Sequence, residues 1–173
     1  VICMVLLCAC HESDNEQILD QLDQVIESKG LYAVRFERRV DSLRRELCTA
    51  SDDTMRWRTA NRLFDSYITY NIDTAARYVA LMYDLAEHTG RRDMKFLSTT
   101  CDISVLIGRN NIEDAYDRIR SLDTAGITKR MRANYYTQQM VVYGRLASQN
   151  TSESRSRAYA LSLIHISEPT RPI

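Results

Sequence analysis

The feature that most constrains this chain is that no proline occurs before Pro169 and that only five glycines occur in 173 residues. Proline and glycine are the residues that most strongly interrupt helices, so the stretch before Pro169 predicts a structure that is helical almost throughout. Apolar residues recur along the same stretch at spacings of three and four, which is the period of an amphipathic helix. We therefore predict an all-α fold.

Two apolar stripes predict a pair of N-terminal helices over residues 14–50, with Gly30 as the stop between them. The stripes consist of Ile18, Leu22, Val25 and Ile26, and of Phe36, Val40, Leu43 and Leu47. The second helix also carries arginines interleaved with acids. That pattern is more typical of a solvated, salt-bridged helix face than of a nucleic-acid patch.

Residues 51–90 predict a helical hairpin. Ser51 is expected to cap its first helix, Asp73 to cap the second after the turn that begins at Asn71, and Gly90 to end the hairpin. The inward-facing stripes are Trp57, Ala60, Phe64 and Tyr67, then Ala75, Val79, Met82 and Ala86. Two helices with matching apolar faces and a tight turn are the unit of a helical repeat.

Further helices are predicted after Gly90, with starts near Asn111, Thr128 and either Thr151 or Ser152. The first of them carries the stripe Met94, Leu97, Cys101 and Val105. Its β-branched residues Ile103, Val105 and Ile107 could instead form a strand, but the sequence offers no partner strand. The stripe Ala115, Ile119 and Leu122 follows, and then Met131, Tyr135, Tyr136, Met140, Tyr143 and Leu146.

A small residue recurs near the start of each second helix. Ala75, Ala115 and Ala158 are 40 and 43 residues apart, and each is placed where two helices would approach closely. These alanines resemble the second-helix alanine of tetratricopeptide repeats, whose regular period is about 34 residues. The resemblance implies that residues 51–160 form elongated, irregular tetratricopeptide-like hairpins stacked into a right-handed α-solenoid.

A more specific resemblance lies in the run from Leu22 to Leu47, LDQVIESKGLYAVRFERRVDSLRREL, followed by the hairpin that ends at Gly90. This arrangement resembles a Bacteroidota family of exported tetratricopeptide proteins. The resemblance implies an export signal, several helical repeats, and then a transmembrane helix with a C-terminal regulatory domain of unknown function. That output domain is expected to be missing from this chain.

Residues 1–10 are interpreted as part of an export signal. The apolar run VICMVLLCA is too short to span a bilayer, which takes about 20 apolar residues, and it ends abruptly in polar sequence. Leu7 to Cys10 resembles a bacterial lipobox, with Cys10 as the lipid-attachment residue. An ordinary cleaved signal, in which Cys10 has no role, stays open. Both interpretations export the chain.

The segment 161–173 is interpreted as non-native. Its sequence from Leu161 to Arg171, LSLIHISEPTR, resembles a translated transposase-type sequencing adapter. Such a scar does not contribute to the native fold. The native gene is then expected to continue beyond Ala160.

Composition and motifs argue against several function classes. The formal net charge is zero, which disfavours a general nucleic-acid binder. The isolated glycines and histidines predict no cofactor and no metal site, and first-turn acid pairs such as Asp52 with Asp53 fit the helix dipole. Cys48 and Cys101 could form a disulfide, although two small buried side chains are favoured. We expect no enzymatic activity.

The expected function is non-covalent recognition of a protein or peptide on a concave groove. The candidate groove residues are Asn61, Arg62, Arg77, Arg132, Tyr135, Tyr136 and Tyr143. For the tyrosines, packing between hairpins is the favoured alternative. The expected context is an envelope-located sensor or regulator, associated with the membrane through a lipid anchor or a lost transmembrane helix. Two alternatives stay open: an envelope lipoprotein that captures a glycan or small ligand, and the N-terminal part of an enzyme whose catalytic domain is lost.

Overall fold

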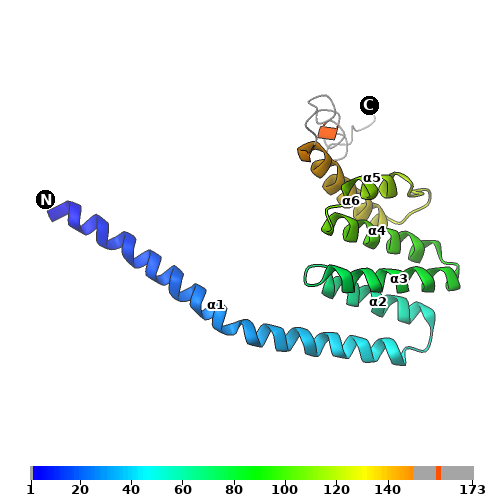
Figure 1. Ribbon diagram of the computed structural model, residues 1–173, viewed down its shortest axis with the longest axis horizontal. Helices are drawn as coiled ribbons and strands as arrows, with labels where there is room; N and C mark the ends of the chain where they lie inside the picture. The colour runs from blue at the N-terminus through cyan, green and yellow to red at the C-terminus, as the bar shows by residue number, and fades with distance from the viewer. Residues whose placement is uncertain (1, 150–158, 161–173) are drawn as a thin grey trace. The chain divides into compact units, whose positions relative to one another are not determined.

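The computed structural model describes residues 2–149 and 159–160, with side chains from residue 16 onward. Within these residues every regular element is a helix (Figure 1). The chain divides into two compact units, residues 1–42 and 43–173, which are described separately below. The predicted helix start near Thr151, the repeat position Ala158 and the segment 161–173 lie outside the described residues, as does the side chain of Cys10.

The first helix, α1, runs without interruption from Ile2 to Thr49. The predicted stop at Gly30, and with it the helical pair over residues 14–50, is therefore wrong. A glycine inside a helix costs only about 1 kcal/mol relative to alanine, and its neighbours include the strong helix formers Glu27, Lys29 and Leu31. A single glycine without a following proline does not end such a helix.

Helices α2 (Asp53–Tyr67) and α3 (Ile72–Thr89) form the predicted hairpin. Their caps are displaced from the predicted ones. The N-cap of α2 is Asp52 and not Ser51, because the Asp52 carboxylate accepts a hydrogen bond from the backbone N–H of Met55 at 2.8 Å. The N-cap of α3 is likewise Asn71 and not Asp73, because the Asn71 side chain accepts a hydrogen bond from the backbone N–H of Thr74 at 2.9 Å. Both caps have extended backbones, the conformation that brings a short side chain to the free N–H three residues on.

Helix α4 (Arg92–Gly108) disproves the alternative of a strand at Ile103, Val105 and Ile107, since all three residues are helical. Helix α5 (Ile112–Arg120) follows a turn in which Asn110 adopts a φ of 59°. Helix α6 (Lys129–Gln149) begins after Thr128, whose hydroxyl accepts the N–H of Met131 at 3.3 Å, as an N-cap should.

The helices from α2 onward pack in chain order, each against the next, and α4 also packs against α6. Stacking of consecutive hairpins in this way is the architecture of a helical-repeat solenoid. It brings α2, α4 and α6, the first helices of successive hairpins, to one side of the stack. The predicted all-α, repeat-type fold is confirmed.

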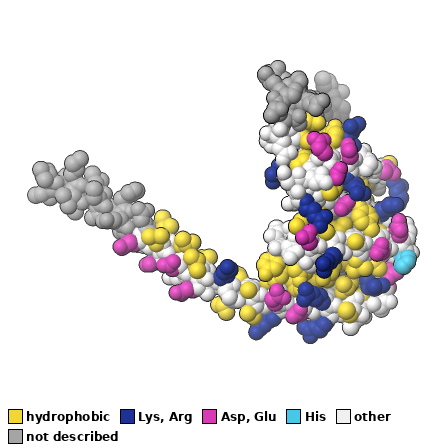
Figure 2. Space-filling view, in the orientation of Figure 1, with side chains coloured by type: hydrophobic (Ala, Val, Ile, Leu, Met, Phe, Trp, Pro, Cys, Tyr) yellow, Lys and Arg dark blue, Asp and Glu magenta, His cyan; other side chains and the backbone are white. Residues whose placement is uncertain are grey.

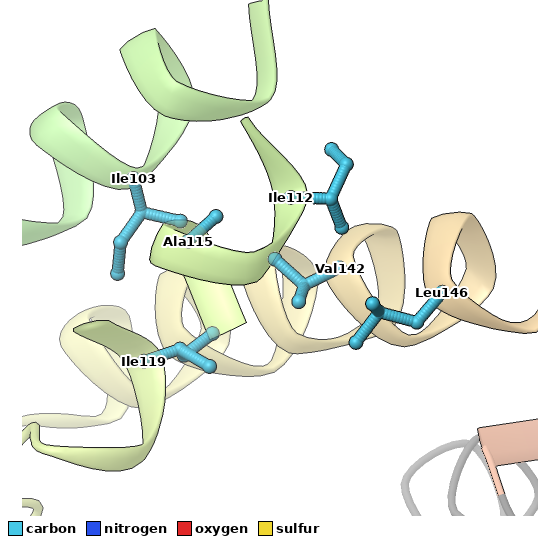
Figure 3. Packing of buried hydrophobic residues seen from close by; sticks show 6 residues of the cluster. All are labelled: Ile103, Ile112, Ala115, Ile119, Val142 and Leu146. Atoms are coloured by element: carbon cyan, nitrogen blue, oxygen red, sulfur yellow. The ribbon is translucent and has the colours of Figure 1, made fainter. Parts of the chain in front are cut away.

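The core follows the predicted stripes of α2 and α3, whereas the first predicted stripe, Ile18, Leu22, Val25 and Ile26, is exposed. Trp57, Ala60, Phe64, Tyr67, Ala75, Val79, Met82 and Ala86 are all buried. A second cluster joins α4, α5 and α6 (Figure 3): Ile103, Ile112, Ala115, Ile119, Val142 and Leu146. Ala75 and Ala115 are both completely buried, which agrees with close helix approach at the recurring small residue.

Candidate binding groove

An open groove lies along the first helices of the hairpins. It has a volume of about 760 Å³ and is lined by residues of α2, α4 and α6, together with neighbouring turn residues. Its size is within the range of small-molecule and peptide sites. On each helix the lining residues recur every three or four positions, so each helix presents one continuous face to it.

Helix α2 contributes the most polar wall. Arg58, Asn61, Arg62 and Asp65 line the groove at helical spacing. Arg58, Arg62 and Asp65 are exposed, whereas Trp57 beneath them is buried. This wall therefore presents charged and amide groups over an aromatic base.

Helix α4 contributes the floor, through Met94, Leu97, Cys101 and Ser104. These side chains are less polar than those of α2. All four are buried or partly buried. The floor therefore offers apolar surface to a ligand, with the Ser104 hydroxyl as a polar group.

Helix α6 completes the site with Arg130, Met131, Asn134 and Gln138. Amide side chains both donate and accept hydrogen bonds, so Asn134 and Gln138 can pair with a peptide backbone or with hydroxyl groups. Arg130 adds a positive charge at the start of the helix.

Hydrogen bonds between the helices hold the three faces in register. The Cys101 thiol donates to the Asn61 Oδ1 at 3.5 Å, which joins α4 to α2. The Gln138 amide donates to the Ser104 hydroxyl at 2.8 Å, which joins α6 to α4. These contacts give the groove walls defined spacing before any ligand binds.

Two of the groove arginines are already paired. Arg62 donates to both carboxylate oxygens of Glu46, at 2.8 and 2.9 Å. Arg91 donates to both oxygens of Asp93, at 3.1 and 2.6 Å, and this contact lowers the pKa of the Asp93 carboxyl. Guanidinium groups that are paired in this way are held in one orientation. They are therefore less available to bind a further anion.

Arg58 and Arg130 differ from them, because neither forms an ion pair within the described part of the chain. Arg58 donates a weak hydrogen bond to the sulfur of Met55, at 3.9 Å. Arg130 lies near Asp65, whose side chain is exposed but whose carboxyl is partly desolvated; this desolvation raises the pKa of the carboxyl, and Arg130 partly lowers it again. The groove therefore contains two arginines whose charge can be offered to a ligand.

The same environment acts on the floor cysteine. Burial, reinforced by the nearby carboxylates of Asp65 and Asp102, raises the pKa of the Cys101 thiol to about 12. A thiol with such a pKa is protonated at neutral pH and is a poor nucleophile. Cys101 is therefore a structural group of the groove. It does not form the considered disulfide with Cys48, since both thiols are free and Cys48 is exposed.

The structure brings two of the seven predicted groove residues, Asn61 and Arg62, to this site. Arg77 and Arg132 are on α3 and α6 and do not line it. Tyr135 packs against the core cluster of α4, α5 and α6. Its neighbour Tyr136 is 45% exposed, with the two ring centroids 5.6 Å apart.

Tyr143 also lies away from the groove. Its ring meets that of Tyr116 edge to face, with centroids 5.7 Å apart, and lies 6.0 Å from the ring of Tyr159. This arrangement matches the favoured alternative, in which tyrosines pack between hairpins. Asn134, which lines the groove, precedes Tyr135 by one residue, and one residue is a rotation of about 100° around a helix. The sequence signal for the groove face is the polar stripe Arg130, Asn134 and Gln138, in which the residues are four positions apart.

The described residues contain neither a metal site nor a membrane-spanning helix. No group of three or more histidines, cysteines or carboxylates is placed to hold a metal ion there. In the same part of the chain, no helix is apolar over a length sufficient to cross a bilayer.

Stacked hairpins with an open groove on their first helices define a helical-repeat interaction protein, a class that is generally non-catalytic. Comparison with protein families makes the assignment specific: the model of the SusR N-terminal TPR domain matches residues 26–168, so the chain belongs to this family. A search of curated proteins and a search of solved structures each found no match to this chain. The matched range includes part of the segment 161–173, whose foreign origin stays a prediction.

Proposed function

We propose that this chain is the ligand-binding module of an envelope-located sensor or regulator and that it binds an extended segment of a protein in the groove between α2, α4 and α6. The observation that carries the proposal is the groove itself, to which α2 and α6 contribute polar side chains and α4 contributes an apolar floor. No covalent step is needed for this function, and we assign it no enzymatic activity.

The groove chemistry suits a peptide. Asn61, Asn134 and Gln138 can exchange hydrogen bonds with backbone amides, while Leu97 and Met131 offer apolar contacts to alternate side chains. Arg58 and Arg130 favour a segment that carries a negative charge. We retain Asn61 and Arg62 as groove residues, with Arg62 held in place by Glu46.

The proposed location rests on different features. The apolar run that ends at Ala9 supports export, and Cys10 supports a lipid anchor. The family is described as the N-terminal domain of SusR, which supports a role in passing a binding signal to a further part of a longer protein. A membrane-spanning helix elsewhere in that protein is the alternative to the lipid anchor.

The test is selection of linear peptides displayed on phage against the immobilised chain, followed by affinity measurement on synthetic peptides. We expect enriched peptides that bind at least about tenfold more weakly to the variant Arg130→Ala/Asn134→Ala, since each of the two hydrogen bonds to the peptide is worth about 1 kcal/mol and neither side chain bridges two helices. The matched control is Arg132→Ala/Tyr136→Ala, which changes exposed residues of the same helix outside the groove and should leave affinity unchanged.

Two outcomes would contradict this function. One is enrichment of no peptide, and the other is binding that the groove substitutions leave intact. Titration with an oligosaccharide panel tests the alternative of glycan capture. Saccharide binding that disappears in Tyr143→Ala, with no peptide binding, would favour that alternative and move the site to the tyrosine cluster.

A further inference from the structure

The ion pair between Arg62 and Glu46 determines how one wall of the groove is charged. Glu46 lies near the end of α1, and its carboxylate accepts hydrogen bonds from the Arg62 Nη1 at 2.8 and 2.9 Å. The buried hydroxyl of Thr59 donates to the Glu46 Oε1 at 3.0 Å. Thr59 and Arg62 are three positions apart on α2 and are therefore neighbours on its surface. The carboxylate is thus held by two side chains of the same helix.

Glu46 approaches Arg62 from outside the groove. Arg62 lines the groove, whereas neither Glu46 nor Thr59 does. The Arg62 side chain is 58% exposed, so a ligand can still contact it. Both hydrogen bonds to Glu46 come from Nη1, and within the described residues no hydrogen bond engages the Arg62 Nη2 or Nε. Arg62 therefore keeps donors for a ligand although its charge is compensated.

The charge of the α2 wall changes from one turn of the helix to the next. Arg58, one turn before Arg62, forms no ion pair within the described part of the chain. Asp65 follows Arg62 by three positions. The wall is therefore positive at Arg58, compensated at Arg62 and negative at Asp65. On the face of the second unit that Figure 2 shows, basic and acidic side chains are likewise interspersed.

We propose that Glu46 determines the charge selectivity of the groove by acting through Arg62. Because its charge is compensated, Arg62 donates to an uncharged acceptor, a backbone carbonyl of the bound peptide, and does not select an acidic side chain. Acidic side chains of the peptide are favoured beside Arg58 and Arg130 instead. Glu46 is a positioning residue that does not touch the peptide itself. This inference rests on the peptide-binding function proposed above.

The test is a glutamate scan of a linear peptide that is selected on the wild-type chain. Each uncharged position of the peptide is replaced in turn by glutamate, and its affinity is measured for the wild type and for Glu46→Gln. Glutamine keeps an oxygen that accepts from Thr59 and Arg62 but removes the negative charge. We expect at least one glutamate peptide whose affinity, relative to the unsubstituted peptide, is about two- to fivefold higher for Glu46→Gln than for the wild type, the range of an exposed ion pair. The gain should disappear at about 1 M salt, where charges are strongly screened.

Three further variants separate this effect from a change of net charge or of structure. Glu87→Gln removes the same charge from an exposed residue of α3 that does not line the groove, so it should leave the selectivity at the wild-type value. Arg62→Gln leaves Glu46 uncompensated and should lower the relative affinity of the same glutamate peptide. Glu46→Gln/Arg62→Gln lacks both charges and should show neither the gain nor the loss.

The results distinguish this inference from the function on which it rests. Peptides that bind the wild type, and bind Glu46→Gln with unchanged charge selectivity, would overturn the role of Glu46 and leave the proposed function standing. A gain that persists in Glu46→Gln/Arg62→Gln would overturn it too, because the added attraction would not come from Arg62. A wild-type chain that binds no peptide would contradict both.

Discussion

The indole N–H of Trp57 donates a hydrogen bond of 3.0 Å to the hydroxyl of Ser98, and this buried contact joins the first helices of two successive hairpins. The same hydroxyl donates to the backbone carbonyl of Met94 at 2.9 Å, so the serine both accepts and donates. The two residues are 41 positions apart, about one repeat. The contact therefore fixes the register of one hairpin on the next, beneath the groove.

Removing this hydrogen bond should destabilise the stack. Ser98→Ala leaves a buried indole N–H without a partner, which should lower the free energy of unfolding by about 1–3 kcal/mol. The measurement is urea unfolding followed by circular dichroism. The control is Ser66→Ala, because Ser66 makes the same bond to the carbonyl four residues earlier but is more exposed. Equal effects of the two substitutions would show that the indole bond contributes nothing.

The recurring alanine should be intolerant of larger side chains. Ala75 is completely buried where α3 packs between α2 and α4, so Ala75→Leu should cost about 1–3 kcal/mol through overpacking. Ala80→Leu changes an exposed residue of the same helix and should change stability by less than about 0.5 kcal/mol. Thermal unfolding of the two variants makes the comparison. A stable Ala75→Leu variant would mean that the small residue is not required for helix approach.

Substitution of alanine for two of the glycines should change the free energy of unfolding in opposite directions. Gly90 ends α3 with a φ of 64°, where a side chain is strained, so Gly90→Ala should cost about 1 kcal/mol. Gly144 lies inside α6, with open space where a Cβ would be, so Gly144→Ala should gain about 0.5–1 kcal/mol. Chemical denaturation of both variants measures the difference. Stabilisation by Gly90→Ala would contradict the left-handed cap.

The two described cysteines should differ in reactivity. Iodoacetamide at pH 8 should alkylate exposed Cys48 in the native chain and leave Cys101 protonated and unmodified until unfolding, as read by peptide mass spectrometry. Rapid native alkylation of Cys101 would contradict its burial.

The raised pKa of Cys101 also predicts a pH dependence. Between its ordinary pKa of 9.0 and the folded value of about 12, the unfolded chain loses the thiol proton while the folded chain keeps it. The folded state then binds more protons, so the free energy of unfolding falls as pH rises through this window. Comparison with Cys101→Ala, which lacks the titrating group, isolates the effect. Parallel pH profiles for the two proteins would exclude it.

Local pattern predicts most elements of this protein. The stripe from Trp57 to Tyr67 is buried as expected, because a helix with apolar residues at this spacing has only one face to bury. The end of α3 at Gly90 also follows from local chemistry. The predicted stop at Gly30 is wrong, because one weak helix former is outweighed by its neighbours over a long helix.

The site is less predictable than the fold. Aromatic side chains often carry binding energy, which favours the tyrosines of α6, yet the groove face is the one that holds Asn134 and Gln138. Both faces have helical spacing, and spacing does not say which face a neighbouring hairpin will cover. Tyr135 packs against the core of α4, α5 and α6, and this contact depends on how the hairpins stack.

By itself, the sequence determined that this protein is a chain of amphipathic helices paired into repeats, because proline scarcity, glycine position and apolar period act through the local backbone. Only the tertiary structure decided which helix faces line the groove, which arginines form ion pairs with carboxylates, and why the Cys101 thiol stays protonated. Those properties arise from burial and charge contributed by residues far away along the chain, as with Cys101 and Asn61, which are 40 positions apart, and no local pattern encodes them.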